Sequence, residues 1–411
     1  MTKPRIGVFH PGTQDAWQRA VAFQDAGALA WYATSAYFHP DSRAVRLAAI
    51  LPGEAGARLR RLLLKRYFPL LDNRHVRRMG ILEFVELMLW RLRWDRLIRR
   101  VNAWGNRRFG QQVISLMQRE PVDIVWGWDT SSLEVFRWAK ARGITCVLNQ
   151  SIGHPAAENA TMLAEQERHP GFFAQAYRPH SQAWIDRQNE EMDLADLVIC
   201  NSDFNASTMI EHGCDPGKVR VVHEGYDETV FPAEPPRRAP LEDRPVKLLF
   251  TGSVGARKGL AYLLPAISRI APSAAELTLV GRMDIPGTTF EKFAGRVTHV
   301  PQVRHEDIVR YYREADLFVF PSLFEGSARV LHEAISAGTG LVHTWMAGLG
   351  ATEGENGTVL NELSVDGLTE TLLTICGDPE RLAAWQVASW ARRLDRTYAN
   401  YRRDIRTLMG V

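Results

Sequence analysis

The sequence predicts an α/β protein made of two doubly wound domains, each with a parallel sheet between helices. Its 411 residues, 45% hydrophobic and 24% charged, have ordinary globular composition and suffice for two domains of about 200 residues each. Short β-rich runs alternate with stretches of helical patterning, an order that gives parallel sheets flanked by helices. The alternation stops once, at the proline-rich stretch FPAEPPRRAPLEDRP, and then resumes.

These observations divide the chain into four parts. We expect an N-terminal domain over residues 1–231, a linker over 232–245, a second domain over 246–385 and a closing helical segment over 386–411. In the first domain the β-rich runs predict strands at residues 5–9, 122–128, 144–149, 196–202 and 219–225, with helices at 131–143 and 202–213. In the second domain they predict strands at residues 246–253, 276–282, 296–302, 316–322 and 340–344.

The composition limits the class of protein. The N-terminus enters an apolar strand without the hydrophobic region of a signal peptide, and no apolar run reaches the roughly 18 to 20 residues that span a bilayer. The cysteines lack CxxC spacing, so they predict neither a disulfide framework nor a zinc site; they are Cys146, Cys200, Cys214 and Cys376. We therefore expect a cytoplasmic protein, and a peripheral position on the inner face of the membrane stays open.

Positive charge is concentrated in one segment. The net charge is +3, but residues 58–108 carry fifteen Arg or Lys against four acids, so this segment contributes +11 and the remainder −8. Apolar residues recur there at helical spacing over residues 81–101, with tryptophans among the arginines at Trp90, Trp94 and Trp104. Such a helix suits an anionic membrane surface, where each basic residue contributes about 1 kcal/mol, or packing on its own domain with a solvated basic face. Both interpretations stay open, and no nucleic-acid motif is present, so nucleic acid is not an expected partner.

The loops after the predicted strands are the candidates for a binding site, because ligands of open parallel sheets bind at the carboxyl ends of the strands. After the first strand, HPGTQ contains Gly12, which allows close approach of backbone to a ligand or simply forms a turn. After the strand at 246–252, the loop SVGARKG brings Arg257 and Lys258 to the start of a helix. Helix N-termini and fixed cations attract anions, so this loop suits a diphosphate, although an exposed turn also explains these residues.

Two glutamates, Glu325 and Glu333, stand at a strand-to-helix junction in PSLFEGSARVLHEAISAGTG. We expect an N-cap at Ser327, a helix after it, and a C′ residue at Gly338. This places Glu325 before the helix and Glu333 about two turns into it, roughly 80° apart around the axis, so both can face one pocket. Carboxylates accept paired hydrogen bonds from vicinal hydroxyls, as in a ribose or a sugar. The alternative is helix-end charge for Glu325 and solvation for Glu333.

Three pieces of the C-terminal half resemble, in order, the nucleotide-binding domain of retaining GT-B fold glycosyltransferases, specifically glycosyltransferase family 4. They are FTGSVGARKGLAYLLPAI, YYREADLFVFPSLFEGSARVLHEAISAGTGLV and TEGENGTVL. In the N-terminal half, LADLVICNSDFNASTMIEHGCDPGKVRVVHEGYDETVF is similar to the family's passage into its second domain. The resemblance covers almost the whole chain. It implies two Rossmann-like domains that face a cleft, a final helix that crosses back to the first domain, and hinge-like closure.

The resemblance also implies roles for individual residues. Glu325 and Glu333 would hold the sugar and the ribose of a nucleotide-sugar donor, and Lys258, together with Arg257, would neutralise the leaving diphosphate. The remaining residues that it assigns to the donor pocket are Gly12, Gly252, Ser253, Gly281, Arg282, Val303, Gly326, Ser327 and Ala328.

Two positions depart from the family pattern. Ser253 stands where many members carry arginine after the TG turn, and Arg257 is placed to compensate. Many members also have a histidine at the end of the strand that here reads Asn149 and Gln150, and His154 is close enough in sequence to take its catalytic place.

By the same resemblance, the protein transfers a hexosyl group from a UDP- or GDP-sugar to an acceptor hydroxyl, with retention at the anomeric carbon. A glycan or lipid-linked acceptor is implied, in polysaccharide, lipopolysaccharide or glycolipid biosynthesis. No DxD-like aspartate cluster follows a predicted strand, which agrees with metal-independent transfer. A nucleotide-sugar-binding pseudoenzyme that acts as a partner or regulator stays open, because Ser253 and Asn149 depart from the family; a GT-B phosphorylase is a remoter alternative.

Overall fold

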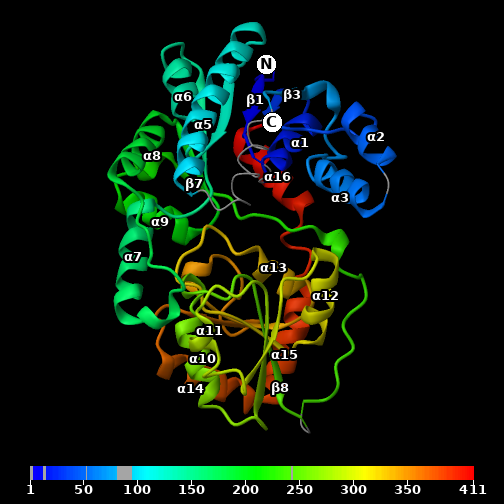
Figure 1. Cartoon of the computed structure of the whole chain (residues 1–411), viewed down its shortest axis with the longest axis vertical. Coiled ribbons are helices and arrows are strands. Elements are labelled where there is room, and N and C mark those ends of the chain that lie inside the picture. Colours follow the sequence, from blue (N-terminus) through cyan, green and yellow to red (C-terminus); the bar gives the residue numbers. More distant parts are fainter. Residues whose placement is uncertain (1–2, 13–14, 52, 81–94, 242–243) are drawn as a thin grey trace.

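The computed structural model describes residues 3–12, 15–51, 53–80, 95–241 and 244–411. It contains two parallel sheets, one above the other along the long axis, each flanked by helices (Figure 1). The predicted α/β class with two doubly wound domains is confirmed. Most of the predicted basic amphipathic helix, residues 81–94, lies outside the described residues. In the described part of the chain, every helix is too short or too polar to cross a membrane.

The first sheet has seven parallel strands among the described residues, in the order β3-β2-β1-β4-β5-β6-β7. They are β1 (Ile6–Phe9), β2 (Leu29–Thr34), β3 (Val76–Arg78), β4 (Ile124–Trp128), β5 (Thr145–Gln150), β6 (Leu197–Cys200) and β7 (Val219–Val221). The accompanying helices are α1 (Ala16–Asp25), α2 (Arg43–Ile50), α3 (Gly53–Leu64), α5 (Asp95–Arg119), α6 (Leu133–Lys140), α7 (Pro155–Arg168), α8 (Gln182–Leu194) and α9 (Asp203–Glu211). Every strand predicted for this half is confirmed, and β2 and β3 are additions.

The second sheet, in the part of the chain that is described, has six parallel strands in the order β10-β9-β8-β11-β12-β13. They are β8 (Val246–Thr251), β9 (Ala275–Val280), β10 (Val297–Val300), β11 (Leu317–Phe320), β12 (Gly340–Thr344) and β13 (Gly357–Leu360). Its helices are α10 (Leu260–Ser268), α11 (Gly287–Phe290), α12 (His305–Glu314), α13 (Arg329–Ser336), α14 (Val365–Cys376) and α15 (Pro379–Ala391). All five predicted strands are confirmed, and β13 is an addition. The strand order reverses between β8 and β11, which makes the loops after these two strands the expected ligand site.

The chain crosses between the two domains at Tyr226 and again before the last helix, α16 (Tyr398–Met409). The two crossings are hydrogen-bonded to each other: the Tyr226 amide donates to the Arg396 carbonyl at 2.9 Å, and the Tyr398 amide donates to the Tyr226 carbonyl at 3.0 Å. Helix α16 lies against the first domain and buries Ile405 in its core. The predicted boundary between residues 385 and 386 falls inside α15, so the return crossing begins after that helix instead.

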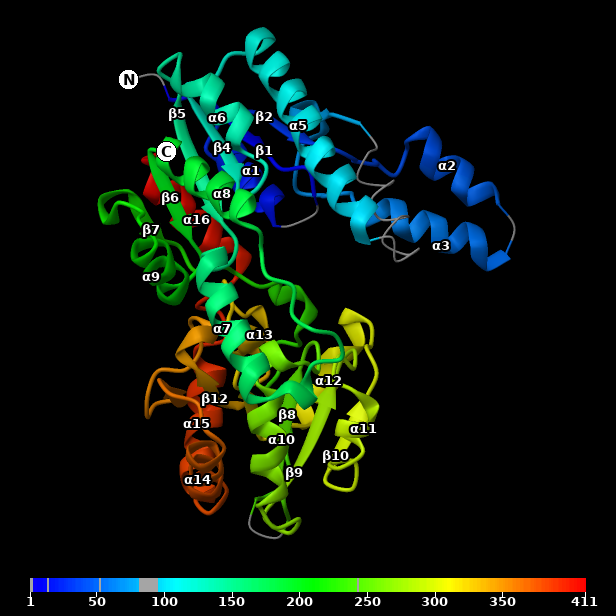
Figure 2. The same cartoon turned by 60° about the vertical axis from the view of Figure 1, so that its left-hand side comes forward.

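Helix α7 extends from the first domain along the side of the second, next to α10 (Figure 2). There the Tyr262 hydroxyl donates to Glu165 Oε1 at 2.8 Å. Just beyond α7, the Thr289 hydroxyl donates to the Gly171 carbonyl at 2.6 Å. The two domains are therefore in contact through α7 and the segment just after it, as well as through the two crossings.

Candidate active site

Two adjoining cavities lie at the carboxyl end of the second sheet, at the reversal of strand order. Their volumes are about 500 and 490 Å³, which is the size range of ligand pockets. The residues that line both are Thr251, Gly252, Ser253, His305, Val330 and Glu333. One cavity continues to Arg282 and Val303, and the other to Lys258, Glu325 and the crossing at Tyr226. We call the two together the main cleft.

Ten of the fourteen predicted site residues line the main cleft. They are Gly252, Ser253, Lys258, Gly281, Arg282, Val303, Glu325, Ser327, Ala328 and Glu333. The remaining four, which are Gly12, His154, Arg257 and Gly326, do not line it.

Glu325 is buried at the centre of a cluster of hydrogen-bond donors. Its Oε1 accepts from Ser322 Oγ at 2.6 Å and from Arg257 Nη1 at 3.0 Å. The Lys258 ammonium donates to the same oxygen. Lys258 also lies 5.0 Å from the centre of the Phe320 ring. Arg257 thus acts on the cleft through Glu325 rather than by lining it.

The charges of this cluster depend on one another. Burial alone would raise the pKa of Glu325, but the charges of Lys258 and Arg257 outweigh burial and hold that pKa below its ordinary value. Burial lowers the pKa of Lys258, and Glu325 opposes that shift. One carboxylate between two cations leaves a net positive charge, which suits an anionic ligand.

Glu333 faces the main cleft from α13 and is fixed by a buried tyrosine. The Tyr312 hydroxyl donates to Glu333 Oε2 at 2.8 Å, and it lies 2.6 Å from Thr251 Oγ1. Since Tyr312 is fully buried, this contact limits the positions open to the Glu333 carboxylate. The carboxylate is therefore held where it can accept hydrogen bonds from a ligand.

The far end of the main cleft is formed by the loops after β8 and β9. These strand ends approach so closely that a Cβ atom on Gly281 would lie 1.7 Å from the Gly252 carbonyl oxygen. The hydroxyl of Ser253 donates to Asp284 Oδ2 at 2.6 Å. Arg282 binds both oxygens of that carboxylate, at 2.7 and 2.8 Å. Ser253 therefore supports Asp284 and adds no charge where many family members have arginine.

The start of α13 differs from the prediction. Ala328, not Ser327, is the N-cap residue, and its amide donates to the Ala347 carbonyl at 2.9 Å. Because the helix begins at Arg329, Glu333 is its fifth residue, a little more than one turn from the start rather than two. At the other end, Gly338 has φ +66°, as predicted for a C′ residue.

The first domain contacts the loop and the helix start that border the main cleft. A Cβ atom on Gly326 would lie 1.8 Å from the Ser151 carbonyl oxygen, and the Gly326 carbonyl accepts from the Ser202 hydroxyl at 2.5 Å. Next to it, Arg329 pairs with Asp15 at 2.6 Å. Gly326 is thus a point of contact between the domains.

Two predicted residues have other roles in the structure. The Gly12 amide donates to His10 Nδ1 at 3.0 Å, so it is used within its own turn. His154 is the N-cap of α7: its Nδ1 accepts from the Ala156 amide at 3.2 Å, and its Nε2 lies 2.8 Å from Asn189 Oδ1. The ring is buried and stacks on His212, with 4.4 Å between centroids. This is a structural position, away from the main cleft.

Several lining residues were not predicted. His305 and Arg304 follow β10, so the strand-end rule could have indicated them. Tyr226 and Tyr398 carry no local signal, because they reach the cleft only through the crossings. Among the described residues there is no group of three or more His, Cys, Asp or Glu side chains that could hold a metal ion.

Two family models match this chain. Glycosyltransferase Family 4 matches residues 73–230, and Glycosyl transferases group 1 matches residues 245–378, so together they cover more than half of the sequence. The D-inositol 3-phosphate glycosyltransferases of Mycobacterium bovis and Mycobacterium tuberculosis are 31% identical in an alignment of 250 residues, and the match covers 53% of this chain and 51% of theirs. The chain spans about half the length of the curated relatives it matches.

Solved structures of similar fold cover nearly the whole chain. Sucrose-phosphate synthase from Thermosynechococcus elongatus has a TM-score of 0.64 at 16% identity and covers 99% of this chain and 98% of its own. HepE of Anabaena, in complex with UDP, has a TM-score of 0.61 at 13% identity and covers 99% and 100%. WaaG, a glycosyltransferase involved in lipopolysaccharide biosynthesis, has a TM-score of 0.59 at 15% identity and covers 99% and 100%. This protein belongs to glycosyltransferase family 4 and has the two-domain GT-B fold.

Proposed function

We propose that this protein is a retaining glycosyltransferase that moves a hexosyl group from a nucleoside diphosphate sugar to an acceptor hydroxyl. The observation that carries the proposal is the joining, in one cleft, of a positively charged cluster around Glu325 with a fixed carboxylate at Glu333. Family membership and the names of the relatives support it.

Each part of the donor has a chemical counterpart in the main cleft. The base would lie among Gly281, Arg282 and Val303, and the ribose hydroxyls would donate to Glu333. The diphosphate would lie between Lys258 and the start of α13, where the helix dipole adds positive potential. A UDP-sugar is the first donor to test, because HepE, a protein of the same fold, is solved with UDP and with UDP-glucose; a GDP-sugar is the second.

The chemistry that follows needs charge stabilisation more than acid–base catalysis. The bond from the anomeric carbon to the diphosphate breaks, and the acceptor oxygen bonds to the same face of that carbon while its proton passes to the departing phosphate. Negative charge grows on the diphosphate, beside Lys258, with Arg257 behind it. Glu325 would accept hydrogen bonds from sugar hydroxyls. We propose metal-independent transfer, with these cations and the α13 dipole in the place of a divalent ion.

A second candidate is a nucleotide-sugar-binding pseudoenzyme. Asn149, where many family members have histidine, accepts from the buried Arg19 guanidinium at 3.0 Å and serves the core of the first domain. His154 caps α7 and lies outside the main cleft, which favours this candidate over catalysis by His154. A pseudoenzyme would bind the donor without turning it over.

The experiment is a thermal stability series with UDP, GDP, ADP and dTDP, each at about 100 times its dissociation constant. One nucleotide should contribute about 2.7 kcal/mol and raise the melting temperature by several degrees. Glu333→Ala should abolish the effect, and the exposed Glu291→Ala should retain it. If no nucleotide stabilises the protein, the donor assignment fails. Diphosphate release from the matching nucleotide sugar then separates transferase from pseudoenzyme.

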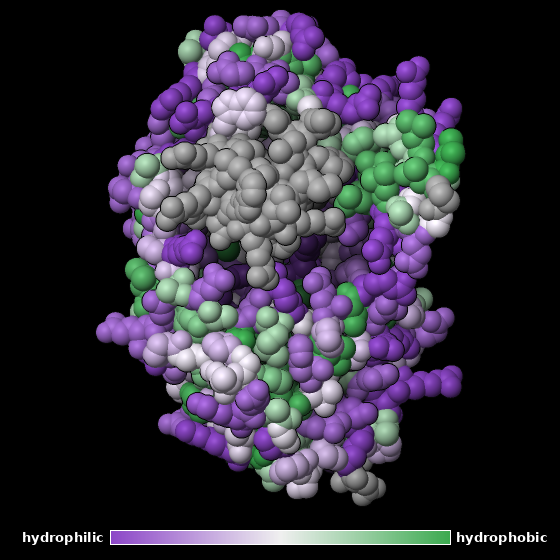
Figure 3. Space-filling model, viewed as in Figure 1, coloured by the Kyte–Doolittle hydropathy of each residue, from purple (hydrophilic) through white to green (hydrophobic). Residues whose placement is uncertain are grey.

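We further propose that the first domain docks on an anionic membrane surface, where a lipid-linked acceptor would lie. Large apolar side chains are exposed on and beside α2 and α3, where a hydrophobic patch is visible in Figure 3; they are Leu47, Ile50, Leu51 and Leu59. Basic side chains are exposed on the same two helices and just after them; they are Arg43, Arg46, Arg58, Arg60, Arg61 and Lys65. The one acidic residue of these two helices is Glu54. Apolar groups beside positive charge complement an anionic lipid surface.

Co-sedimentation with phosphatidylglycerol vesicles tests this surface. Binding should weaken with added salt and should fall at least about tenfold in Ile50→Ser, since apolar insertion and charge act together. Val387→Ser, at an equally exposed valine of the second domain, is the matched control and should bind as the parent does. Equal binding to vesicles of phosphatidylcholine, a zwitterionic lipid without net charge, or no loss in Ile50→Ser, would contradict the proposal.

A further inference from the structure

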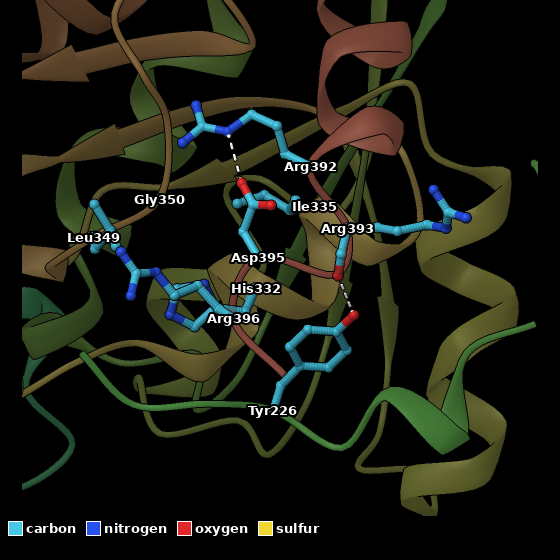
Figure 4. A pocket seen from close by; sticks show the side chains of 9 residues that line it. All are labelled: Tyr226, His332, Ile335, Leu349, Gly350, Arg392, Arg393, Asp395 and Arg396. Atoms are coloured by element: carbon cyan, nitrogen blue, oxygen red, sulfur yellow. Dashed lines mark hydrogen bonds and ion pairs between the residues drawn. The ribbon is translucent and has the colours of Figure 1, made fainter. Parts of the chain in front are cut away.

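A smaller cavity, separate from the main cleft, lies beside α13 and next to the crossings between the domains (Figure 4). Its walls come from α13, the loop at Gly350, Tyr226 and the returning segment 392–396. It offers about 50 Å³ to water-sized groups, whereas one water needs about 10–15 Å³ by the same measure. The space is therefore sufficient for a small ligand.

His332 on α13 presents unused hydrogen-bonding groups to this cavity. It is 1% exposed, and neither of its ring nitrogens has a partner among the described residues. A buried imidazole offers one donor and one acceptor, and leaving both unpaired opposes folding unless a ligand pairs with them. The nearby His223 has a buried Nδ1 that also lacks a partner in the described part of the chain.

The walls of the cavity are positively charged, with three arginines against Asp395. Two of the arginines are engaged: Arg392 Nε lies 3.4 Å from Asp395 Oδ2, and the Arg393 guanidinium lies 4.3 Å from the centre of the Trp390 ring. Arg396 makes a longer contact, 3.7 Å from Nη1 to Asp404 Oδ2. Figure 4 shows its guanidinium beside His332. Arg396 is thus the cation best placed to take a further anion.

We propose that this cavity binds a phosphate-type oxyanion, held by Arg396 and His332, at a site separate from the main cleft. Phosphate oxygens would accept from the Arg396 guanidinium and from one N–H of His332. Free phosphate and the phosphate group of a small metabolite share this chemistry, and inorganic phosphate is the probe that tests it.

The proposed oxyanion site lies at the crossings between the two domains. Arg396 belongs to the return crossing, and its carbonyl accepts from the Tyr226 amide. His332 belongs to α13, whose next residue is Glu333 of the main cleft. Tyr226 lines both the small cavity and the main cleft. An oxyanion bound by both Arg396 and His332 would link the return crossing to α13 through hydrogen bonds.

The test is calorimetric titration of inorganic phosphate into the full chain carrying Lys258→Ala, which removes the main cation of the main cleft. One saturable site is expected. Adding Arg396→Gln should weaken binding at least tenfold, and adding His332→Phe, which keeps the ring shape but not the nitrogens, should do the same. Arg310→Gln, at an exposed arginine of α12 that lines neither the small cavity nor the main cleft, is the control and should leave phosphate binding unchanged.

Two results would overturn the proposal: no saturable binding at millimolar phosphate, or unchanged binding in both Arg396→Gln and His332→Phe. His332→Phe removes unpaired polar atoms, so without phosphate it should melt no lower than its parent. It therefore decides the question even if Arg396→Gln does not fold.

Discussion

Lys258 is the single side chain on which the proposed chemistry depends most, because it is the cation that lines the main cleft next to Glu325. Lys258→Ala should lower kcat by about 10²–10³, the usual effect of removing one group that stabilises transition-state charge. The measurement is the initial rate of diphosphate release from the nucleotide sugar. Lys292→Ala, at an exposed lysine of the same domain, is the control. A loss of less than threefold in Lys258→Ala would contradict the assigned role.

Buried histidines make stability depend on pH, and three of those in the described residues have especially low pKa values. Burial is the largest cause of the lowered pKa of each, to about 4 for His10, about 3 for His332 and about 4 for His343. Each is neutral in the folded protein and takes up a proton on unfolding once the pH is below its ordinary pKa of 6.5. The free energy of unfolding should therefore fall as the pH drops below 6.5, by up to about 1.4 kcal/mol per pH unit for each histidine.

Urea unfolding between pH 5 and 7 in phosphate-free buffer measures this dependence. His332→Phe should flatten it, because the proton that His332 takes up on unfolding is absent in the variant. If the slope is the same in the variant and in the parent, His332 is not buried in its neutral form.

At the scale of elements, Gly259 is the residue that joins α10 to the loop of Glu325. It is the N-cap of α10 with φ +75°, and a Cβ atom there would lie 1.9 Å from the Pro321 carbonyl oxygen. Gly259→Ala should cost about 1–3 kcal/mol and displace the loop after β11, so nucleotide binding should weaken too. Melting temperature and UDP affinity are the measurements. Gly287→Ala, whose added Cβ atom meets open space, should change neither the melting temperature nor the UDP affinity. If the two variants behave alike, the contact of Gly259 with Pro321 does not have the role assigned to it.

The elements that sequence patterning predicted are those with strong apolar runs. β2, LAWYAT, is an apolar run, but its two alanines have low strand propensity. β3 is only three residues long and lies within a basic stretch. The N-cap was misplaced by one residue because Ser327 has the higher cap propensity, whereas the contact of Ala328 with Ala347 decides where α13 begins. That contact is between two different segments of the chain, so the helix propensity of residues near Ser327 does not predict it.

The site was predictable where it is encoded locally. Lys258, Glu325 and Glu333 stand in motifs at strand ends, and the structure brings them into one cleft. The contact of Arg329 with Asp15 joins residues more than three hundred positions apart, and only the packing of the domains creates it. For His154 a sequence signal was available, since proline in the next position is typical of a helix start.

At the scale of the whole molecule, Gly326 sets how closely the domains approach. Gly326→Ala places a Cβ atom against the Ser151 carbonyl, so the domains should separate at this point. Small-angle scattering should show a larger radius of gyration, and the transfer rate should fall while the melting temperature of the second domain changes little. Gly295→Ala, which meets no atom, is the control. An unchanged radius in Gly326→Ala would show that the loop, rather than the domain, gives way.

Because of helix α16, the first domain receives its last core residues only after the second domain has been synthesised. Tyr401 and Ile405 belong to the core of the first domain, yet the ribosome adds them after the whole of the second. Domains generally fold as they emerge, the N-terminal one first. Here the second domain, continuous from β8 to α15, has its core residues in place while the first still awaits its last helix. A nascent chain paused before Tyr398 would expose the apolar surface of α1, which is where a chaperone would be expected to bind.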